Sequence, residues 1–411
     1  MTTRRVVLTG RGVISPLGVG IEPHWAALCA GRSAIAAVPL LQALGLATAR
    51  GAEIPGSLLD AHRGRLPRKQ QKLYNRATLL GMLAASLAVE DAGLAAPALD
   101  PDRIGVVLGV NVLAWSLGAM TEYLVAAESP APARTLDMAR ANAFCMHHIN
   151  PLDYSLKTLP NLAAGHLAIA HNARGLCRAL TDGPLGGAHA IGQACRLIAE
   201  GELDVALCGG TDAPLEDLVY ATSAGLGLLA TDDGLSPGGI DGEGAGILVL
   251  EAAEHAQSRG ARVWGEIRGY AAAAGDGTLA PHDDPGRLAA RLERVVREAS
   301  DEAGGLPDLV SLHGDGIPAH DGAEALALGR FLESAPAVRL KSALGNLGTA
   351  STPIEVLSCS AMLRHAMIPP TLSVTSSESR SGLHRVLVVG LGLFGECAAL
   401  ILERPGGLRA N

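Results

Sequence analysis

The stretch TDGPLGGAHAIG, from Thr181 to Gly192, predicts a sharp turn that opens a helix. The extended run GLCRAL, which begins at Gly175, precedes this turn, and apolar residues recur at helical spacing from Ala188 to Ile198 after it. We therefore expect a strand, a tight turn and a buried helix. Backbone N–H groups at a helix N-terminus stabilise a thiolate or a developing oxyanion, so acyl-transfer enzymes place Cys or Ser at such a turn. In this chain the position holds Pro184.

From Gly175 to Gly210 the chain resembles, without a gap, the active-site segment of the β-ketoacyl-acyl-carrier-protein synthases, or ketosynthases, which reads roughly STACASGAHAIG. The resemblance places Pro184 on their nucleophilic cysteine, which implies that the acyl acceptor is lost. Proline also has no N–H, so one of two oxyanion donors is lost, at a typical cost of about 3–4 kcal/mol of transition-state stabilisation. Pro184 equally suits the first position of a helix, where a missing N–H costs nothing, and the two interpretations are compatible.

Composition excludes several classes of protein. Of the 411 residues 51 are glycine and 48% are apolar, which favours a large buried α/β core with many tight turns. Aromatic residues make up only 3%, the net charge is −8 and no basic face stands out, so nucleic acid is not expected as a partner. An uninterrupted apolar run of about 18 residues is absent, and the chain enters a strand at Arg4, so we expect neither a membrane span nor a signal peptide.

Cysteines and histidines give no sign of a disulfide framework or a metal site. The seven cysteines sit in apolar runs without CxxC spacing and are typical of reduced thiols in a cytoplasmic protein. The histidine pairs at 147–148 and at 166 and 171 have no Asp, Glu or Cys beside them at ligand spacing. Packed or polar histidines, with no bound metal, are the expectation.

Motifs of the ketosynthase scaffold recur over residues 10–402, nearly the whole chain. The run from Val6 to Gly18 is similar to the family's first strand and turn, and Glu243–Gly246 to its GEGAG hairpin. The alternation of strands and helices starts again after about residue 255. The resemblance implies an α/β, thiolase-like fold of five layers, αβαβα, with two similar halves, residues 1–254 and 255–411.

Two ketosynthase histidines hold the thioester carbonyl and stabilise the enolate that malonyl decarboxylation leaves. The resemblance places His313 at the first and Asn346, five residues after the motif's Lys341, at the second. Asparagine donates a hydrogen bond but carries no proton at neutral pH, so general-acid or cationic help is lost there. Asp315 and Ile317 replace the two threonines that contact the phosphopantetheine arm, so the resemblance does not extend to those contacts.

Near the C-terminus, GLGLFG from Gly390 to Gly395 has the spelling of a dinucleotide-binding motif. The run that follows it, CAALIL, predicts a strand instead of the helix that would hold a pyrophosphate, so we expect no nucleotide cofactor. The same stretch resembles the ketosynthase loop GFGGTN, which supplies the second oxyanion N–H. The resemblance places Gly390, Leu391 and Gly392 in that loop.

Residues 111–160 follow the family pattern least clearly. In the ketosynthases this region carries the dimer contact and the cap over the acyl tunnel. The resemblance therefore implies that Trp115, Met120 and Tyr123 reach the interface where the acyl tunnel of a partner ends.

The residues that differ from the ketosynthase pattern are those needed for catalysis, whereas the scaffold motifs are kept. This predicts a chain that folds and dimerises but does not catalyse the condensation reaction. Such chains are the chain-length factors, partners of a Cys-bearing ketosynthase in type II polyketide, polyene or fatty acid biosynthesis; an acyl carrier protein is then a further partner. Those proteins commonly carry glutamine where this chain has Pro184. Two alternatives stay open: an acyltransferase without an acyl-enzyme, in which His313 is the base and Asp182 or Thr181 assists, and a homodimeric scaffold that binds acyl chains or carrier proteins.

Overall fold

A computed structural model describes residues 4–94, 100–111, 116–130, 135–150, 157–280, 284–332, 335–369, 372 and 382–406. Ten strands form one continuous sheet in the order β11-β10-β12-β13-β9-β1-β8-β7-β5-β6, and the short β2 (Gly18–Val19) pairs with the end of β1. The ten strands are β1 (Val6–Ser15), β5 (Ile104–Val110), β6 (Cys177–Leu180), β7 (Val205–Asp212), β8 (Gly244–Ala252), β9 (Gly265–Ala273), β10 (Leu309–Ser311), β11 (Ala337–Val338), β12 (Arg385–Leu391) and β13 (Cys397–Glu403).

The two halves of the sheet have the same topology. If the five strands of each half are numbered along the chain, each half lies in the order third, second, fourth, fifth, first. The second strand of each half pairs in parallel with the third and the fourth, and the remaining pairs within a half are antiparallel. The two first strands, β1 and β9, meet in the middle and pair antiparallel. This repetition confirms the prediction of two similar halves.

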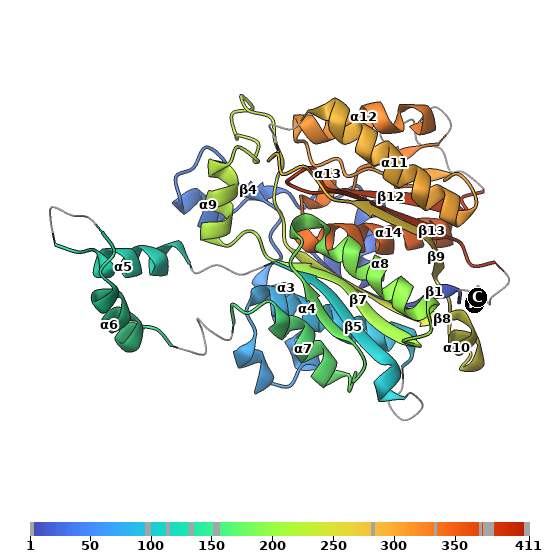
Figure 1. Cartoon of the computed structure of the whole chain (residues 1–411), viewed down its shortest axis with the longest axis horizontal. Helices are drawn as coiled ribbons and strands as arrows, with labels where there is room; N and C mark the ends of the chain where they lie inside the picture. Colours follow the sequence, from blue (N-terminus) through green and yellow to red (C-terminus); the bar gives the residue numbers. More distant parts are fainter. Residues whose placement is uncertain are drawn as a thin grey trace.

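Helices complete five layers (Figure 1). The central helices α8 (Gly186–Ala199) and α14 (Ser351–His365) lie between the halves, α4 (Arg76–Ala92) and α7 (Asn161–Ala170) cover the outer face of the first half, and α11 (Pro285–Ala303) and α12 (Pro318–Leu332) cover that of the second. The remaining helices are α1 (Ile21–Cys29), α2 (Pro39–Ala43), α3 (Gly56–Asp60), α5 (Leu117–Ala127), α6 (Met138–His148), α9 (Asp217–Gly225), α10 (Ala253–Ser258) and α13 (Lys341–Leu344). The predicted αβαβα architecture is confirmed. The boundary predicted between residues 254 and 255 falls within α10 and stays a prediction.

Sequence explains this layering directly. Every residue of β5 and β7 is buried, as expected for strands covered by helices on both faces. Glycine allows the two central helices to meet at their N-termini, because a Cβ on Gly187 would lie 2.1 Å from the carbonyl oxygen of Thr349.

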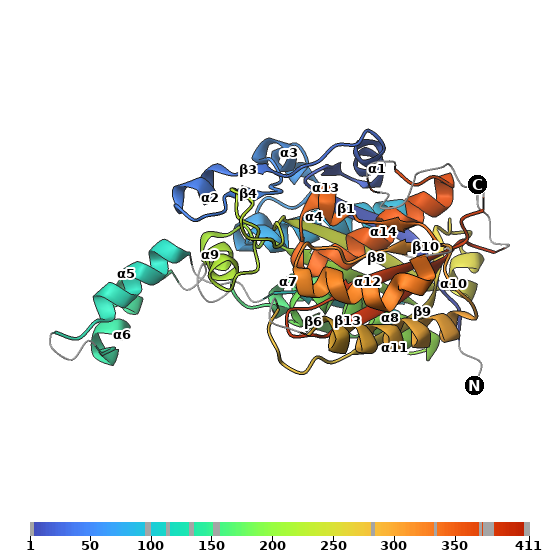
Figure 2. The ribbon, with the colours of Figure 1, turned by 90° about the horizontal axis from the view of Figure 1, so that it is seen from above.

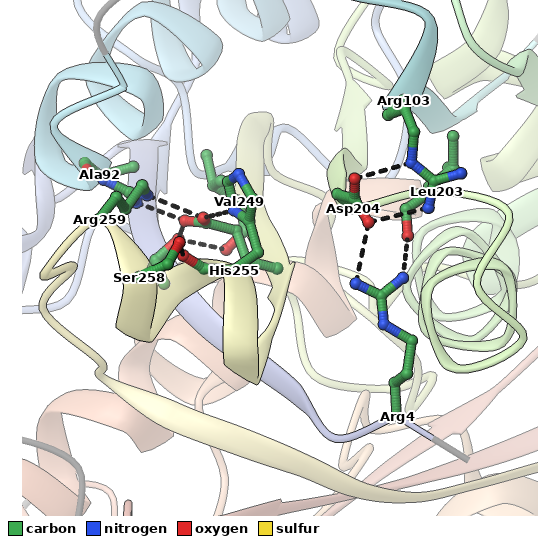
Figure 3. A network of polar contacts seen from close by, with 11 residues as sticks. Arg4, Ala92, Arg103, Leu203, Asp204, Val249, His255, Ser258 and Arg259 are labelled. Atoms are coloured by element: carbon green, nitrogen blue, oxygen red, sulfur yellow. Dashed lines mark hydrogen bonds and ion pairs between the residues drawn. The ribbon is translucent and has the colours of Figure 1, made fainter. Parts of the chain in front are cut away.

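Ion pairs join residues that come just before three strands of the first half, β1, β7 and β5 (Figure 3). Asp204 accepts hydrogen bonds from Arg103 Nε at 2.7 Å and from the Arg4 guanidinium at 2.8 Å. These contacts with Arg103 and Arg4 lower the pKa of Asp204 to about 2 although burial opposes the shift. The fully buried Glu251 accepts from His255 at 2.7 Å and from Arg259 at 2.8 Å, which ties α10 to β8.

One helical hairpin stands apart from the layered body. Both views show α5 and α6 projecting away from the sheets (Figures 1 and 2). Apolar side chains exposed on this hairpin are Leu124, Val125, Leu136, Met138 and Met146. Among the described residues, no helix combines the length and apolar character that crossing a bilayer requires.

Candidate active site

Pro184 lies where the strand–turn–helix prediction puts it. Strand β6 leads into a 3-10 turn, Gly183–Leu185, which runs directly into α8, and Pro184 is the middle residue of that turn. Gly183 has φ 55°, in the left-handed region that glycine adopts without strain. Pro184 is half-buried, and the helix behind it is buried along Gly186–Ala188, so the predicted turn and buried helix are confirmed.

Two cavities meet at this turn. The first, of about 590 Å³, is lined mainly by small and apolar groups, and the second, of about 450 Å³, carries most of the polar ones. Residues that line both are Thr181, Gly183, Pro184, Leu393 and Phe394. All seven cysteines are described and unpaired, and none of them lines either cavity. No thiol therefore borders the space in front of the turn.

His313 follows strand β10 and is 2% exposed. Its Nδ1 accepts the backbone N–H of Leu391 at 3.2 Å and faces the ammonium of Lys341 at 3.4 Å. Because both neighbours of Nδ1 are donors, the ring proton sits on Nε2, which donates to Asp315 Oδ2 at 3.0 Å. Burial, and then the charge of Lys341, lower the pKa of His313 to about 4, so the imidazole is neutral at pH 7.

Asp315 accepts hydrogen bonds from two further groups besides His313. His320 donates Nδ1–H to the same Oδ2 at 2.9 Å, and the N–H of Ile317 donates to Oδ1 at 3.0 Å. Burial opposes ionisation, but the adjacent His313 and His320 hold the pKa of Asp315 well below its usual range. The carboxylate is therefore ionised at every physiological pH.

His313, Asp315 and His320 have the residue types of a metal site, and their ligand atoms lie within 4.8 Å of one another. A histidine that binds metal through Nε2 needs a proton on Nδ1 to donate to an outer partner. Here Nδ1 of His313 faces only donors. The arrangement fits a hydrogen-bonded cluster and does not fit a metal centre.

Buried charges fix the loop that carries His313. Lys341 Nζ donates to Glu355 Oε1 at 2.6 Å. Glu324 accepts the N–H groups of His313 at 2.6 Å and of Gly314 at 2.8 Å, and burial raises the pKa of Glu324 to about 7. Lys341 thus has a structural ion pair and keeps a donor directed at the imidazole.

Asn346 lies just before the 3-10 turn that opens α14. Its Oδ1 accepts the N–H of Gly348 and the hydroxyl of Ser351, both at 3.1 Å. Asn346 lines the 450 Å³ cavity together with Pro184 and Asp315. The fold therefore brings the predicted nucleophile and second-histidine positions to one cavity.

The N–H groups of Leu391, at the end of β12, and of Gly392 and Phe394, just after it, are engaged within the protein. Leu391 donates to His313, and Gly392 donates to the carbonyl of Glu396 at 2.9 Å. The oxyanion role of Gly390, Leu391 and Gly392 stays a prediction. The GLGLFG stretch turns between β12 and β13 and leads into a strand, as expected from its sequence.

Two of the three predicted tunnel residues lie on the projecting hairpin. Met120 and Tyr123 are half-buried on α5, where the Tyr123 ring packs edge-on against Phe144 at 6.1 Å between centroids. Neither lines the two cavities. Trp115 lies outside the described residues, so its predicted place is untested.

Sequence reasoning missed two carboxylates in the 450 Å³ cavity, Asp212 and Asp241. Asp212 accepts the N–H groups of Thr349 at 3.1 Å and Ala213 at 2.9 Å, and a hydrogen bond from Asn111. Burial raises the pKa of Asp212 to about 6, and burial together with Asp212 and Asp315 raises that of Asp241 to about 7. One signal was present, because IDGEG places an aspartate directly before a buried hairpin.

Comparisons with known proteins agree with this geometry. Residues 3–256 match the N-terminal domain of β-ketoacyl synthase and residues 264–375 its C-terminal domain. The chain is 31% identical to 3-oxoacyl-[acyl-carrier-protein] synthase 2 of Rhizobium meliloti, over 98% of this chain and 100% of that protein. It is 28% identical to the tetracenomycin polyketide synthase ketoacyl synthase alpha subunit of Streptomyces glaucescens, over 99% of both.

Solved structures give the same result. The ishigamide ketosynthase/chain length factor superposes with a TM-score of 0.82 at 27% identity, covering 98% of this chain and 100% of that one. Two adjoining domain matches, a full-length relative above 30% identity and a thiolase-like fold lead to one conclusion: the chain belongs to the β-ketoacyl synthase family.

Proposed function

We propose that this chain is a non-condensing ketosynthase-like subunit of the chain-length-factor type, which pairs with a Cys-bearing ketosynthase in type II polyketide, polyene or fatty acid biosynthesis. The observation that carries the proposal is Pro184 at the head of α8, in a scaffold that is otherwise complete. Proline offers neither a thiol nor an N–H at the point where an acyl group would be held.

Further support comes from the neighbours of Pro184. Asn346 uses Oδ1 to hold the local backbone, and His313 points its only N–H at Asp315. The similarity to a ketosynthase/chain length factor structure and to polyketide ketosynthase subunits supports the same pathway class. An acyl carrier protein is the further proposed partner, and the free cysteines suit the proposed cytoplasmic location.

The helical hairpin α5–α6 is the proposed contact with the ketosynthase. Its exposed apolar residues would lose water contact against a partner, and obligate interfaces bury more than roughly 2,000 Å². Met120 and Tyr123 would then lie near the partner's acyl tunnel. Met146 on the hairpin is 82% exposed and Leu235 on the body is 83% exposed, which gives a matched pair for testing.

Co-expression with a Cys-bearing ketosynthase and size-exclusion chromatography tests the pairing. We expect a stable one-to-one complex and a higher soluble yield than for the chain alone. Met146→Asp should weaken the complex, whereas Leu235→Asp should leave it intact. A monodisperse homodimer that ignores the ketosynthase would contradict the proposal.

Intact-mass measurement tests the missing chemistry. The purified chain, incubated with an acyl-carrier thioester, should show no mass increase, whereas the Cys-bearing ketosynthase should gain one acyl group under the same conditions. An acyl adduct on this chain would contradict the proposal that the chain cannot form an acyl-enzyme.

The geometry does not favour the alternative acyltransferase with His313 as base. Nδ1 is occupied by the N–H of Leu391, Nε2 carries the proton, and the pKa of His313 is lowered to about 4 by burial. An imidazole in this state has no lone pair directed at the cavity. Asp182, the suggested helper, is paired with His189 at 2.9 Å.

A further inference from the structure

His313 can donate in one direction only. Two donors, the N–H of Leu391 and the ammonium of Lys341, stand around Nδ1 and leave the proton on Nε2. In the ketosynthase family the histidine at this position holds the thioester carbonyl. Any substrate oxygen at His313 would therefore have to accept from Nε2–H.

Asp315 Oδ2 already accepts from that N–H at 3.0 Å. The carboxylate is fixed from two further sides, by His320 Nδ1 at 2.9 Å and by the N–H of Ile317 at 3.0 Å. Asp315 is 7% exposed, and it lines the 450 Å³ cavity, whereas His313 does not. The side chains themselves are almost fully buried, 1% exposed for Asp315 and 3% for His313, so the carboxylate is the acceptor that the imidazole N–H already has at the edge of the cavity.

We propose that Asp315 is a positioning residue that occupies, with its own carboxylate oxygen, the acceptor place that a substrate oxyanion would take on His313. We call the set of Asp315, His313 and His320 the Asp315 clamp. The clamp gives a reason for the proposed lack of catalysis that is separate from the missing thiol. A fixed negative oxygen in that place removes the donor and also repels an enolate.

His320 belongs to the clamp because it holds the carboxylate and not the substrate. It is 1% exposed, its Nδ1–H donates to Asp315, and its Nε2 is buried without a hydrogen-bond partner among the described residues. With two imidazoles and one backbone N–H on it, the carboxylate has no rotational freedom to release His313.

The first test is a spectroscopic one on the native chain labelled with ¹⁵N-histidine. Long-range ¹H–¹⁵N correlation should show His313 as the neutral Nε2–H tautomer from about pH 5.5 to 8.5, with slow proton exchange. Asp315→Thr, or Asp315→Ala if threonine prevents folding, should speed that exchange at least tenfold, because alanine offers no acceptor to His313. His24, buried between Ser15 and Ser358 hydroxyls, is the internal control and should not change.

An Nδ1–H tautomer in the native chain would overturn the clamp, and so would exchange that neither variant accelerates. Assignment of the signals comes from His313→Gln and His320→Gln. These measurements need no partner and no activity, so they are independent of the pairing proposed above, which size-exclusion chromatography tests with the native chain.

The second test measures how the Asp315 clamp affects decarboxylation of a malonyl thioester. Pro184→Cys with Asn346→His rebuilds the family's nucleophile and second histidine, and the same variant with Asp315→Thr also opens the clamp. Loss of one oxyanion donor costs about 10²–10³ in rate, so decarboxylation of a malonyl thioester should be at least about 100-fold faster with the clamp open. No gain on adding Asp315→Thr would overturn the functional part of the proposal.

Discussion

Replacement of Asp241 by asparagine should stabilise the fold above neutral pH. Burial and the nearby Asp212 and Asp315 raise the pKa of Asp241 to about 7, from an ordinary value of 3.8. The folded chain therefore binds a proton that the unfolded chain has lost, and the free energy of unfolding falls as pH rises between about 4 and 7. The difference between about 7 in the folded chain and 3.8 in the unfolded chain, at 1.36 kcal/mol for each tenfold change in proton affinity, gives a cost of up to about 4 kcal/mol at pH 8.

Urea denaturation of native chain and Asp241→Asn at pH 5, 6, 7 and 8 measures this cost. The variant should gain up to about 4 kcal/mol at pH 8 and no more than about half of that at pH 5. Asp301→Asn, at an exposed position of α11, is the matched control and should leave the free energy of unfolding unchanged at both pH 5 and pH 8. A gain that does not grow with pH would refute the argument from burial.

Three further outcomes follow from the structure. Pro184→Cys alone should self-acylate weakly or not at all in an intact-mass assay, and strong condensation by it would show that Asn346 is adequate. Alanine at Trp115, Met120 or Tyr123 should lengthen the product of the heterodimer if a cavity opens, as mass spectrometry of products would show, and unchanged length for all three would refute their tunnel role. Asp204→Asn should cost about 2 kcal/mol at pH 7, because its folded pKa of about 2 lies below the unfolded value, and the loss should shrink as pH falls toward 2 in the same urea assay.

Local patterns predicted the scaffold well. The turn at Pro184, the buried helix after it and the repeated strand–helix alternation each depend on neighbours in sequence, so periodicity and turn chemistry were sufficient. The resemblance to ketosynthases added the layers and the positions of His313 and Asn346.

Tertiary contacts explain what the sequence left open. The tautomer of His313 is set by Leu391, 78 residues further along the chain, and no local pattern reports that hydrogen bond. Asp212 and Asp241 lie on different segments and meet only where the cavity forms. The hairpin α5–α6 projects from the body with apolar residues exposed, and no local pattern in its sequence indicates that placement.

The repetition of topology explains why the altered positions keep the fold intact. Pro184 and Asn346 lie in corresponding regions of the two halves, because each comes after the third strand of its half and close to the N-terminus of a central helix: Pro184 lies within a 3-10 turn and Asn346 two residues before one. Proline suits a helix start because it lacks only an N–H that would be unpaired there. Asn346 forms an Asx turn ahead of the other helix, because its Oδ1 accepts the N–H of Gly348 and the hydroxyl of Ser351. Both turns are thus compatible with the start of a helix, so the proposed loss of acyl-transfer chemistry would leave the scaffold intact.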